Sequence, residues 1–410
     1  MRRPRLNAGL DIGSTHVVAA IAQQKNNDIE IIGVGSVPSE GVRRGEIVNM
    51  ESSIHAIKKA LEIAEEAADC DIRSVIVGMN AISTASFSQF GVTRIKRRQV
   101  SNEDIQRVMD SARTINLGNN RRILHVLPKG FVIDNSHSIK DPLGMTGVRL
   151  ECNVHMVTAA EPPIDNIANC CHKAGLDVQG LVLQQLAAAA AVLTHEEKEL
   201  GIALIDLGGG TTSGITYING TVWNTFAIPF GGNHLTNDLA YGLHISFQEA
   251  ERLKKNFGSA VYHHPDNGKT VEVLSPGNET SIKIKPHTVS EFIFHQLEDT
   301  LTMVRDELAA SGFLARRNNG AVLTGGTAQL AHVGKLAEEV LELPVRIGCP
   351  HFFPSTTNGE PEKEEKKPTT LSPEYSTAVG LALMGLDPAN RAASPFKAGI
   401  WRKIAMLMNG

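Results

Sequence analysis

The sequence is poor in aromatic residues, has few cysteines and carries little net charge. Phe, Trp and Tyr make up 5% of the 410 residues, and the formal net charge is -4. A nucleic-acid-binding protein would show a strong basic excess, so that class is not favoured. The five cysteines form no CxxC pair, and their odd number argues against a closed disulfide framework. We therefore expect a protein of a reducing cytoplasm.

Long apolar runs are also missing. No window offers the roughly 20 apolar residues that a transmembrane helix needs. The first residues, MRRPRLNAGLDIG, lead directly into a short apolar strand, without the apolar core of a secretion signal. We expect a protein that is neither secreted nor transmembrane. Because 410 residues exceed what one hydrophobic core usually supports, we also expect at least two domains.

What the sequence does contain is one pattern written twice. An apolar strand, an aspartate, a turn of small residues and a second apolar strand occur in AGLDIGSTHVVAAIA (8–22) and in ALIDLGGGTTSGITY (203–217). Such turns bring backbone N–H groups and hydroxyls to a point that a phosphate can approach. A third turn, Gly325-Gly326-Thr327, follows the apolar strand GAVLT. One turn alone is more often a plain hairpin, but three in this order predict two related lobes that face one nucleotide.

The aspartate at the end of each repeated strand has a chemical use. A nucleoside triphosphate carries Mg²⁺, which keeps several waters and is commonly held through one or two carboxylates. Asp11 and Asp206 are therefore our candidates for the metal site. The alternative is that each aspartate only caps its turn.

The order of predicted elements indicates an insertion in the first lobe. Antiparallel strands over 6–37 and a helix over 54–70 form the first part. Residues 82–160 differ, because two β-rich stretches enclose one helix and a loop-rich run that contains LPKG, DNSHS and DPLGM. An alanine-rich helix over 185–200 is expected to run between the lobes. The polar, proline-rich segment 354–373 is predicted to be a mobile loop, and the helix EYSTAVGLALMGL returns to the core.

At this point the residues resemble the actin-like ATPases, which include heat-shock chaperones and sugar kinases. The resemblance narrows to the FtsA family of bacterial cell-division proteins and covers nearly the whole chain. It is carried by GLDIGSTHV, GVRRGEIVN, HVLPKGFVID, DPLGMTGVRLECNVHMVT, VLTHEEKELGIALIDLGGGTTSGITY, PFGGNHLTNDLA, EAERLK and AVLTGG. It implies an α/β protein with a two-lobed actin-like (ribonuclease H-like) fold, an FtsA-type inserted subdomain and a C-terminal amphipathic helix.

The resemblance also implies domain boundaries. The first lobe core would comprise 1–81 and 161–197, with the inserted subdomain at 82–160 between them. The second lobe core would comprise 198–230 and 312–386, with a small subdomain at 231–311. A tether at 387–394 and an amphipathic membrane-targeting helix at 395–410 would follow.

Site residues are implied by matching the family's motifs position by position. Phosphate contacts fall on Gly13, Ser14, Thr15, Gly208, Gly209, Gly210, Thr211 and Thr212, and magnesium falls near Asp11 and Asp206. Adenosine contacts fall on Gly232, Glu251, Lys254, Gly325 and Gly326. Glu251 and Lys254 are three residues apart on one helical face, where an exposed ion pair is the alternative to a ribose or base contact.

Two positions depart from the family pattern. His16 stands where many members have lysine, and Ser213 stands where many have aspartate. Because histidine is mostly neutral at pH 7, His16 is expected to be a weaker phosphate partner. We therefore expect ATP binding but at most a weak ATPase. Gln184 is a candidate for orienting an attacking water, and the alternative is a residue that merely starts a helix.

The last residues, PFKAGIWRKIAMLMNG, predict an amphipathic helix. At about 100° per residue, one arc of the helix contains Phe396, Ile400, Trp401, Ile404, Leu407 and Met408. Arg402 and Lys403 lie outside this arc, and Lys397 lies inside it, where a long lysine near a helix end can snorkel. Such a helix suits a membrane interface. The alternative is a terminal helix that packs on the protein's own core.

The resemblance implies a role at the cytoplasmic side of the cell membrane, at the division site. The chain would self-associate into filaments, bind lipid through its C-terminal helix and anchor the C-terminal tail of FtsZ on the small subdomain. Lys283, Lys285 and Arg305 are cationic candidates for contacts with that tail, or simply part of a solvated helix face. The inserted subdomain, with RIKRR at 94–98, would contact the next subunit and later division proteins.

Two other classes of protein fit the sequence less well. A small-metabolite kinase of the same superfamily would need a catalytic base and a substrate pocket, and no such constellation is recognisable. A chaperone ATPase would need a large substrate-binding domain after the nucleotide-binding part, and only about two dozen residues follow MGL.

Overall fold

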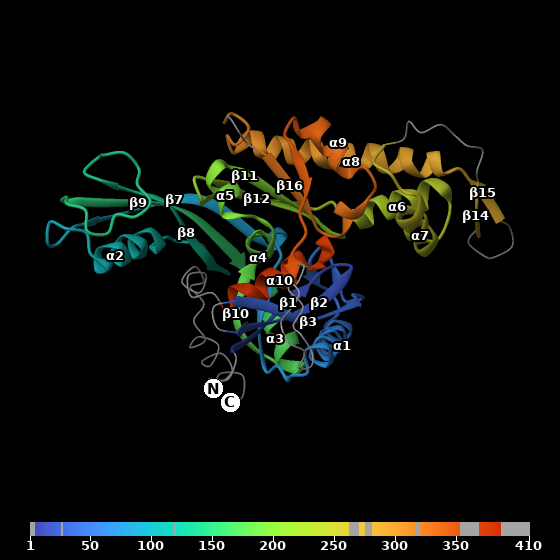
Figure 1. The fold of residues 1–410 in the computed structure, drawn as a ribbon, viewed down its shortest axis with the longest axis horizontal. Helices are drawn as coiled ribbons and strands as arrows, with labels where there is room; N and C mark the ends of the chain where they lie inside the picture. The colour runs from blue at the N-terminus through green and yellow to red at the C-terminus, as the bar shows by residue number, and fades with distance from the viewer. Residues whose placement is uncertain are drawn as a thin grey trace, which may run out of the picture.

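The computed structural model describes residues 5–25, 28–118, 120–261, 270–274, 281–316, 320–352 and 369–386. Two five-stranded sheets form the centres of two lobes (Figure 1). The sheet of the first lobe runs in the order β3 (Asp28–Pro38), β2 (His16–Lys25), β1 (Arg5–Ile12), β6 (Ser74–Met79) and β10 (Asp177–Leu183). The sheet of the second lobe runs in the order β13 (Thr221–Ile228), β12 (Thr212–Ile218), β11 (Ile202–Leu207), β16 (Gly320–Thr324) and β17 (Val345–Ile347).

The two sheets have the same topology. In each sheet the first three strands in the chain pair antiparallel. A fourth strand then pairs in parallel with the central strand, and a fifth pairs in parallel with the fourth. The register repeats as well, because Asp11 lies opposite Val18 and Asp206 lies opposite Ser213, seven residues later in both cases. The sequence pattern that occurs twice therefore corresponds to two sheets of the same topology and register.

Helices pack on both sheets, and two further helices contact each other between the lobes. α1 (Met50–Ala68) and α3 (Glu161–Lys173) lie in the first lobe, and α8 (Pro286–Ala310) and α9 (Val333–Leu341) lie in the second (Figure 1). α4 (Gln184–Val192) contacts strands of both sheets and packs on α10 (Ser376–Met384). This confirms the prediction of an alanine-rich helix between the lobes.

That helix is shorter than predicted. Instead of one helix to residue 200, α4 ends at Val192, Leu193 is extended, and α5 (His195–Leu200) begins anew. Thr194 caps α5, since its hydroxyl accepts from Glu197 N at 3.2 Å and the Glu197 carboxylate accepts from Thr194 N at 2.9 Å. This capping box provides hydrogen bonds for the new helix start, which favours a break over continuation.

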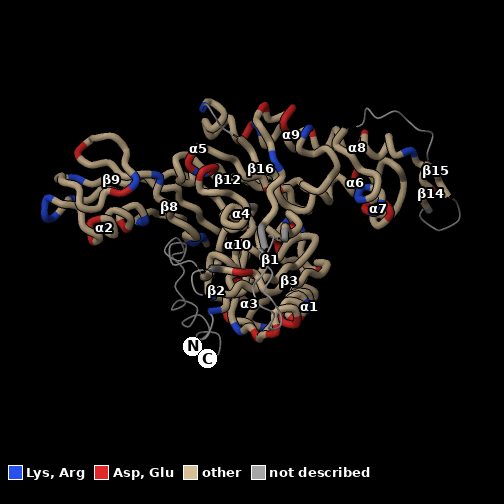
Figure 2. The backbone as a smooth tube through the Cα atoms, in the orientation of Figure 1, with Lys and Arg blue, Asp and Glu red and all other residues tan. Residues whose placement is uncertain are grey.

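The module inserted after β6 forms a layer of its own with a separate apolar core, and it also packs on both lobes. Its sheet has the order β7 (Thr84–Arg94), β9 (Arg149–Ala160) and β8 (Arg121–Ile133), and α2 (Asn102–Arg113) packs on it. Lys and Arg residues gather at its far end, around the loop of residues 95–100 (Figure 2). The prediction of a loop-rich run across LPKG was wrong there, because 121–133 form β8. Pro128 is tolerated because β8 is an edge strand and its register shifts between Pro128 and Gly130.

The remaining elements form a small unit beside the second lobe and several short pieces. α6 (Gly232–Leu243), α7 (Phe247–Phe257), β14 (Val271–Leu274) and β15 (Ser281–Ile284) lie at the end opposite the insert (Figure 1). Two-residue strands form the hairpins β4 (Val42–Arg43) with β5 (Glu46–Ile47), and β18 (His351–Phe352) with β19 (Thr369–Thr370). All five cysteines are free. Among the described residues, no helix has the length and apolar character to cross a membrane.

Candidate functional site: a cleft between two phosphate-type hairpins

The cleft between the lobes is lined by most of the residues that the repeated pattern and the family resemblance predicted. It encloses about 640 Å³. The predicted residues along its walls are Asp11, Gly13, Ser14, Thr15, His16, Gln184, Asp206, Gly208, Gly209, Gly210, Thr211, Gly232, Glu251, Lys254, Gly325 and Gly326. Thr212 does not line it, because this residue is buried in β12, opposite Leu207. The membrane-facing residues predicted after 394 lie outside the described residues.

The two hairpins share one backbone arrangement. Gly13 N donates to the His16 carbonyl and Gly208 N donates to the Thr211 carbonyl, each at 3.0 Å. They face each other so closely that a Cβ on Gly209 would overlap the Thr15 hydroxyl, which is buried and has no hydrogen-bond partner among the described residues. An incoming anion-bound water or phosphate oxygen would satisfy such a hydroxyl.

The second hairpin is held against the start of α6. The Gly208 carbonyl accepts from Gly232 N at 2.9 Å, and the Gly209 carbonyl accepts from Asn233 N at 2.7 Å. The Thr327 hydroxyl also donates to the Gly208 carbonyl, at 3.1 Å. Because C=O and N–H lie on opposite sides of a trans peptide, the N–H groups of Gly209 and Gly210 point away from α6. A turn with outward N–H groups suits an anion.

The two aspartates are partly buried near the ends of equivalent strands. Burial, and then the charge of Asp206, raise the pKa of Asp11 to about 7, although a hydrogen bond from Gln184 lowers it. Burial raises the pKa of Asp206 to about 6, against a hydrogen bond from Thr377 that lowers it. Two neighbouring, partly buried carboxylates are costly unless a cation or a proton compensates their charge. Their oxygens are the ligand type that Mg²⁺ prefers, so the residues present fit that ion.

The adenosine side of the cleft contains a buried polar cluster. Lys254 Nζ lies 2.6 Å from a Glu251 carboxylate oxygen and donates to Thr236 Oγ1 at 2.8 Å and to the Gly232 carbonyl at 3.0 Å. The Lys254 side chain is only 10% exposed. The ion pair considered in the sequence analysis therefore exists, but it is not an exposed one. Burial lowers the pKa of Lys254, and Glu251 raises it again.

His16 and Gln184 both line the cleft, where burial and hydrogen bonds act on their side chains. Burial, the largest effect, lowers the pKa of His16, and Glu374 raises it again. The Gln184 amide donates to Asp11 Oδ1 at 2.6 Å. Among the described residues, no group of three or more His, Cys, Asp or Glu side chains could hold a metal by itself.

Sequence reasoning missed several lining residues. Asn80, Asn233, Lys255, Glu374 and Thr377 also border the cleft. Asn233 directly follows Gly232 in the matched motif PFGGNHLTNDLA, so the sequence did offer a signal for it. The other four belong neither to a glycine turn nor to the matched motifs, and no signal in the sequence identifies them. Lys283 and Arg305, predicted to contact a partner, have neighbours: Lys283 lies 3.8 Å from the Glu272 carboxylate, and Arg305 donates to the Val340 carbonyl at 3.4 Å.

Solved structures with a similar fold come from the actin-like ATPases. A PilM-PilN type IV pilus biogenesis complex has a chain that is 16% identical, with a TM-score of 0.64, over 93% of this chain and 99% of that chain. MreB5 of Spiroplasma citri, solved bound to ADP, is 15% identical, with a TM-score of 0.50, over 84% and 92% of the two chains. These likenesses confirm the predicted two-lobed actin-like fold.

Sequence comparison is more specific. The family model described as cell division protein FtsA matches residues 203–380, and the model of the SHS2 domain inserted in FtsA matches residues 82–158. The chain is 36% identical to cell division protein FtsA of Pseudomonas aeruginosa over 96% of this chain and 93% of the relative. It is 34% identical to that of Bacillus subtilis, over 93% and 83% of the two chains. The kinase alternative is not favoured by these relatives. The chain belongs to the FtsA family of bacterial cell-division proteins.

Proposed function

We propose that this protein binds ATP with Mg²⁺ between its lobes, polymerises on the cytoplasmic side of the cell membrane and anchors FtsZ at the division site. The observation that carries the nucleotide part is the pair of equivalent hairpins, with the partly buried Asp11 and Asp206, which face each other across one cleft. Gly13–Thr15 and Gly208–Thr211 would contact the phosphates, and Gly232, Glu251, Lys254, Gly325 and Gly326 the adenosine. Bound Mg²⁺ would offset the charge of both carboxylates and of the phosphates.

The domain boundaries given above are part of the proposal. The inserted subdomain 82–160 would recruit later division proteins and contact the next subunit, and the small subdomain 231–311 would bind the FtsZ tail. Family membership supports these roles, and cationic residues such as Lys283, Lys285 and Arg305 suit an acidic peptide. Hydrolysis, with Gln184 orienting the water, would be slow at most.

The tail 395–410 is proposed to lie in the membrane interface. The tether 387–394 spans at most about 25–30 Å when extended, so the body would sit close to the lipid. Phe396, Ile400, Trp401, Ile404, Leu407 and Met408 would be buried among the acyl chains, with Arg402 and Lys403 toward anionic headgroups.

Co-sedimentation with liposomes tests this function. The whole chain and a chain ending at Ser394 are each mixed with liposomes that contain anionic lipid, with and without Mg²⁺ and ATP, and the pellets are imaged by electron microscopy. We expect the whole chain to pellet as filaments on lipid and the shortened chain to stay in solution. If both behave alike, the tail is not an anchor and the membrane role is wrong.

A further inference from the structure

The side chain of Asn80 occupies the place where the two lobes meet beside Asp11. Asn80 directly follows β6, is 8% exposed and lines the cleft together with Gln184 and Thr211. Its Nδ2 lies 3.2 Å from Gln184 Oε1 and 3.4 Å from Thr211 Oγ1. Gln184 belongs to the first lobe and Thr211 to the second hairpin. One amide group therefore joins a first-lobe side chain to a second-lobe hydroxyl.

The direction of this amide is determined by its surroundings. The backbone N–H of Ile82 donates to Asn80 Oδ1 at 2.8 Å, and an N–H group requires the oxygen, so Nδ2 must face the other way. Gln184 then has to present its Oε1 to Asn80, which leaves Nε2 to donate to Asp11 Oδ1 at 2.6 Å. The hydrogen bonds thus run in one sense from a backbone N–H to a carboxylate.

A tight turn packs against the Asn80 side chain. Gly45 has φ +75°, and a Cβ there would overlap the Asn80 amide carbon and nitrogen. Gly45 N donates to Ser14 Oγ of the first hairpin at 2.7 Å. The Asn80 side chain is therefore packed as well as hydrogen-bonded, and its position is coupled to both phosphate-type hairpins.

We propose that Asn80 is a positioning residue for the terminal phosphate of a bound nucleoside triphosphate. It holds the Gln184 amide in one direction beside Asp11 and ties it to Thr211 across the cleft. This inference rests on the proposed nucleotide function. Asp11 would help to hold the Mg²⁺ that accompanies a nucleoside triphosphate, and the network that ends on Asp11 would then act on the phosphate that a diphosphate lacks. Asn80 acts on that phosphate through Gln184.

The test measures the affinities for Mg-ATP and Mg-ADP by calorimetry on the full chain. Wild type, Asn80→Ala, Gln184→Ala and the double variant are compared. We expect Asn80→Ala to reduce the preference for ATP over ADP by about tenfold, the effect of losing a hydrogen bond to a charged network, and to leave ADP affinity within about twofold. Because Asn80 acts through Gln184, the double variant should match Gln184→Ala.

Two further variants keep the result interpretable. Asn80→Leu keeps a side chain that branches at Cγ against Gly45 but has no donor, so it should reproduce the loss of preference if Asn80→Ala is poorly folded. Ser83→Ala is the matched control, since the Ser83 hydroxyl donates to the backbone carbonyl of Asn80, at 3.4 Å, and not to its side chain. This variant should leave both affinities within about twofold.

Three results would overturn the role of Asn80: no change in preference in Asn80→Ala, an equal loss of ATP and ADP affinity, or losses that add in the double variant. A wild-type chain that binds neither nucleotide would instead overturn the proposed nucleotide function.

Discussion

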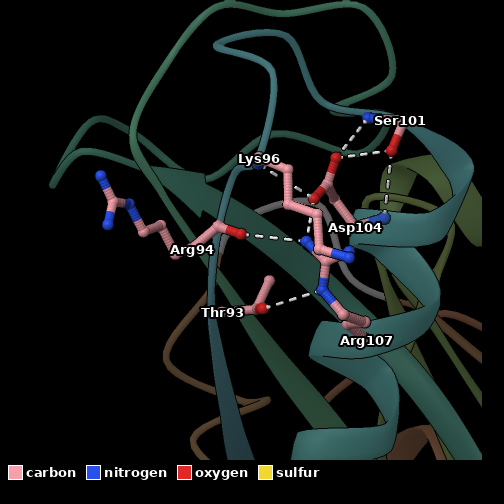
Figure 3. Close-up of polar contacts among 6 residues, drawn as sticks. All are labelled: Thr93, Arg94, Lys96, Ser101, Asp104 and Arg107. Atoms are coloured by element: carbon pink, nitrogen blue, oxygen red, sulfur yellow. Dashed lines mark hydrogen bonds and ion pairs between the residues drawn. The ribbon is translucent and has the colours of Figure 1, made fainter.

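At the residue scale, one buried carboxylate holds the start of α2 against the inserted sheet. Asp104 is 1% exposed and accepts from Ser101 Oγ at 2.5 Å, from Ser101 N at 2.9 Å and from Lys96 N at 3.4 Å (Figure 3). It also pairs with Arg107, which donates to the Arg94 carbonyl at 3.0 Å. The network therefore holds the two ends of the segment that leads from β7 into α2.

Asp104 is expected to stabilise the insert in a pH-dependent way. Burial alone would raise the pKa of Asp104, but hydrogen bonds from Ser101 and Lys96 and the charge of Arg107 lower it to about 2. Asp104→Asn should weaken the insert by about 1.5–3 kcal/mol at pH 7, because hydrogen bonds to a charged group are lost. Hydrogen exchange of the α2 amides measures this change.

The direction of the pH dependence follows from the shift of the Asp104 pKa between the folded and the unfolded chain. Because the folded pKa lies below the unfolded value of about 3.9, the stabilisation is fully present above about pH 4 and is lost as the pH falls toward 2. The difference between wild type and Asp104→Asn should shrink over that interval. A difference that stays constant down to pH 2 would show that the charge of Asp104 contributes nothing.

At the element scale, the contact between α4 and α10 depends on small residues. Ala187 and Ala188 are fully buried, and a Cβ on Gly380 would overlap the Ala187 backbone. The start of α10 reaches the second lobe, since Ser376 Oγ lies 2.7 Å from Thr324 Oγ1 at the end of β16. The crossing of two small-residue helices thus places both sheets around the cleft.

Enlarging Gly380 should separate these helices. We expect Gly380→Ala to cost at least about 1–3 kcal/mol, the usual range for overpacking, and to lower the melting temperature in a thermal unfolding measurement. Gly334→Ala in α9 is the control, because a Cβ there would meet only Ile347 Cδ1 at 3.8 Å. A melting temperature in Gly380→Ala equal to that of the control would refute the close crossing.

At the scale of the whole molecule, the insert belongs to the first lobe in sequence but contacts the second lobe in space. Ser86 Oγ donates to the Thr225 carbonyl at 3.0 Å, and His155 Nε2 lies 2.9 Å from Thr225 Oγ1. Lys129 Nζ lies 4.6 Å from the centre of the Trp223 ring. The insert is therefore held by β13, an edge strand of the second sheet.

Removing the charge of Lys129 should loosen this contact, although Arg316 also lies over the Trp223 ring, at 4.8 Å. Lys129→Met keeps the apolar stem and loses a cation–π interaction of about 0.5–2 kcal/mol. In a Trp401→Phe background, Trp223 is the only tryptophan, and we expect its fluorescence to be quenched more readily by acrylamide. Lys198→Met, which removes a cation 5.4 Å from the Tyr217 ring, should leave the quenching unchanged. Equal quenching in wild type and Lys129→Met would mean that Lys129 does not hold the contact.

Much of the fold could be predicted from local patterns. The antiparallel strands, the helix of α1 and the glycine turns follow from periodicity and turn chemistry, which act over a few residues. β8 could not be predicted, because Pro128 and Gly130 indicate a loop unless the strand is known to lie at an edge. The end of α4 was detectable in principle from Thr194 and Glu197, the two residues of a capping box.

The residues of the candidate site also fall into two groups, those that local patterns predict and those that they do not. The sequence by itself determined the two hairpins and their aspartates, because a strand that ends in a small-residue turn specifies its own backbone. Only the tertiary structure decided that Asn80 meets Gln184 and Thr211, that Lys254 is buried and that the insert rests on β13. These contacts join residues about 20 to 130 positions apart, and a side chain carries no local signal of which distant partner the packed lobes bring to it.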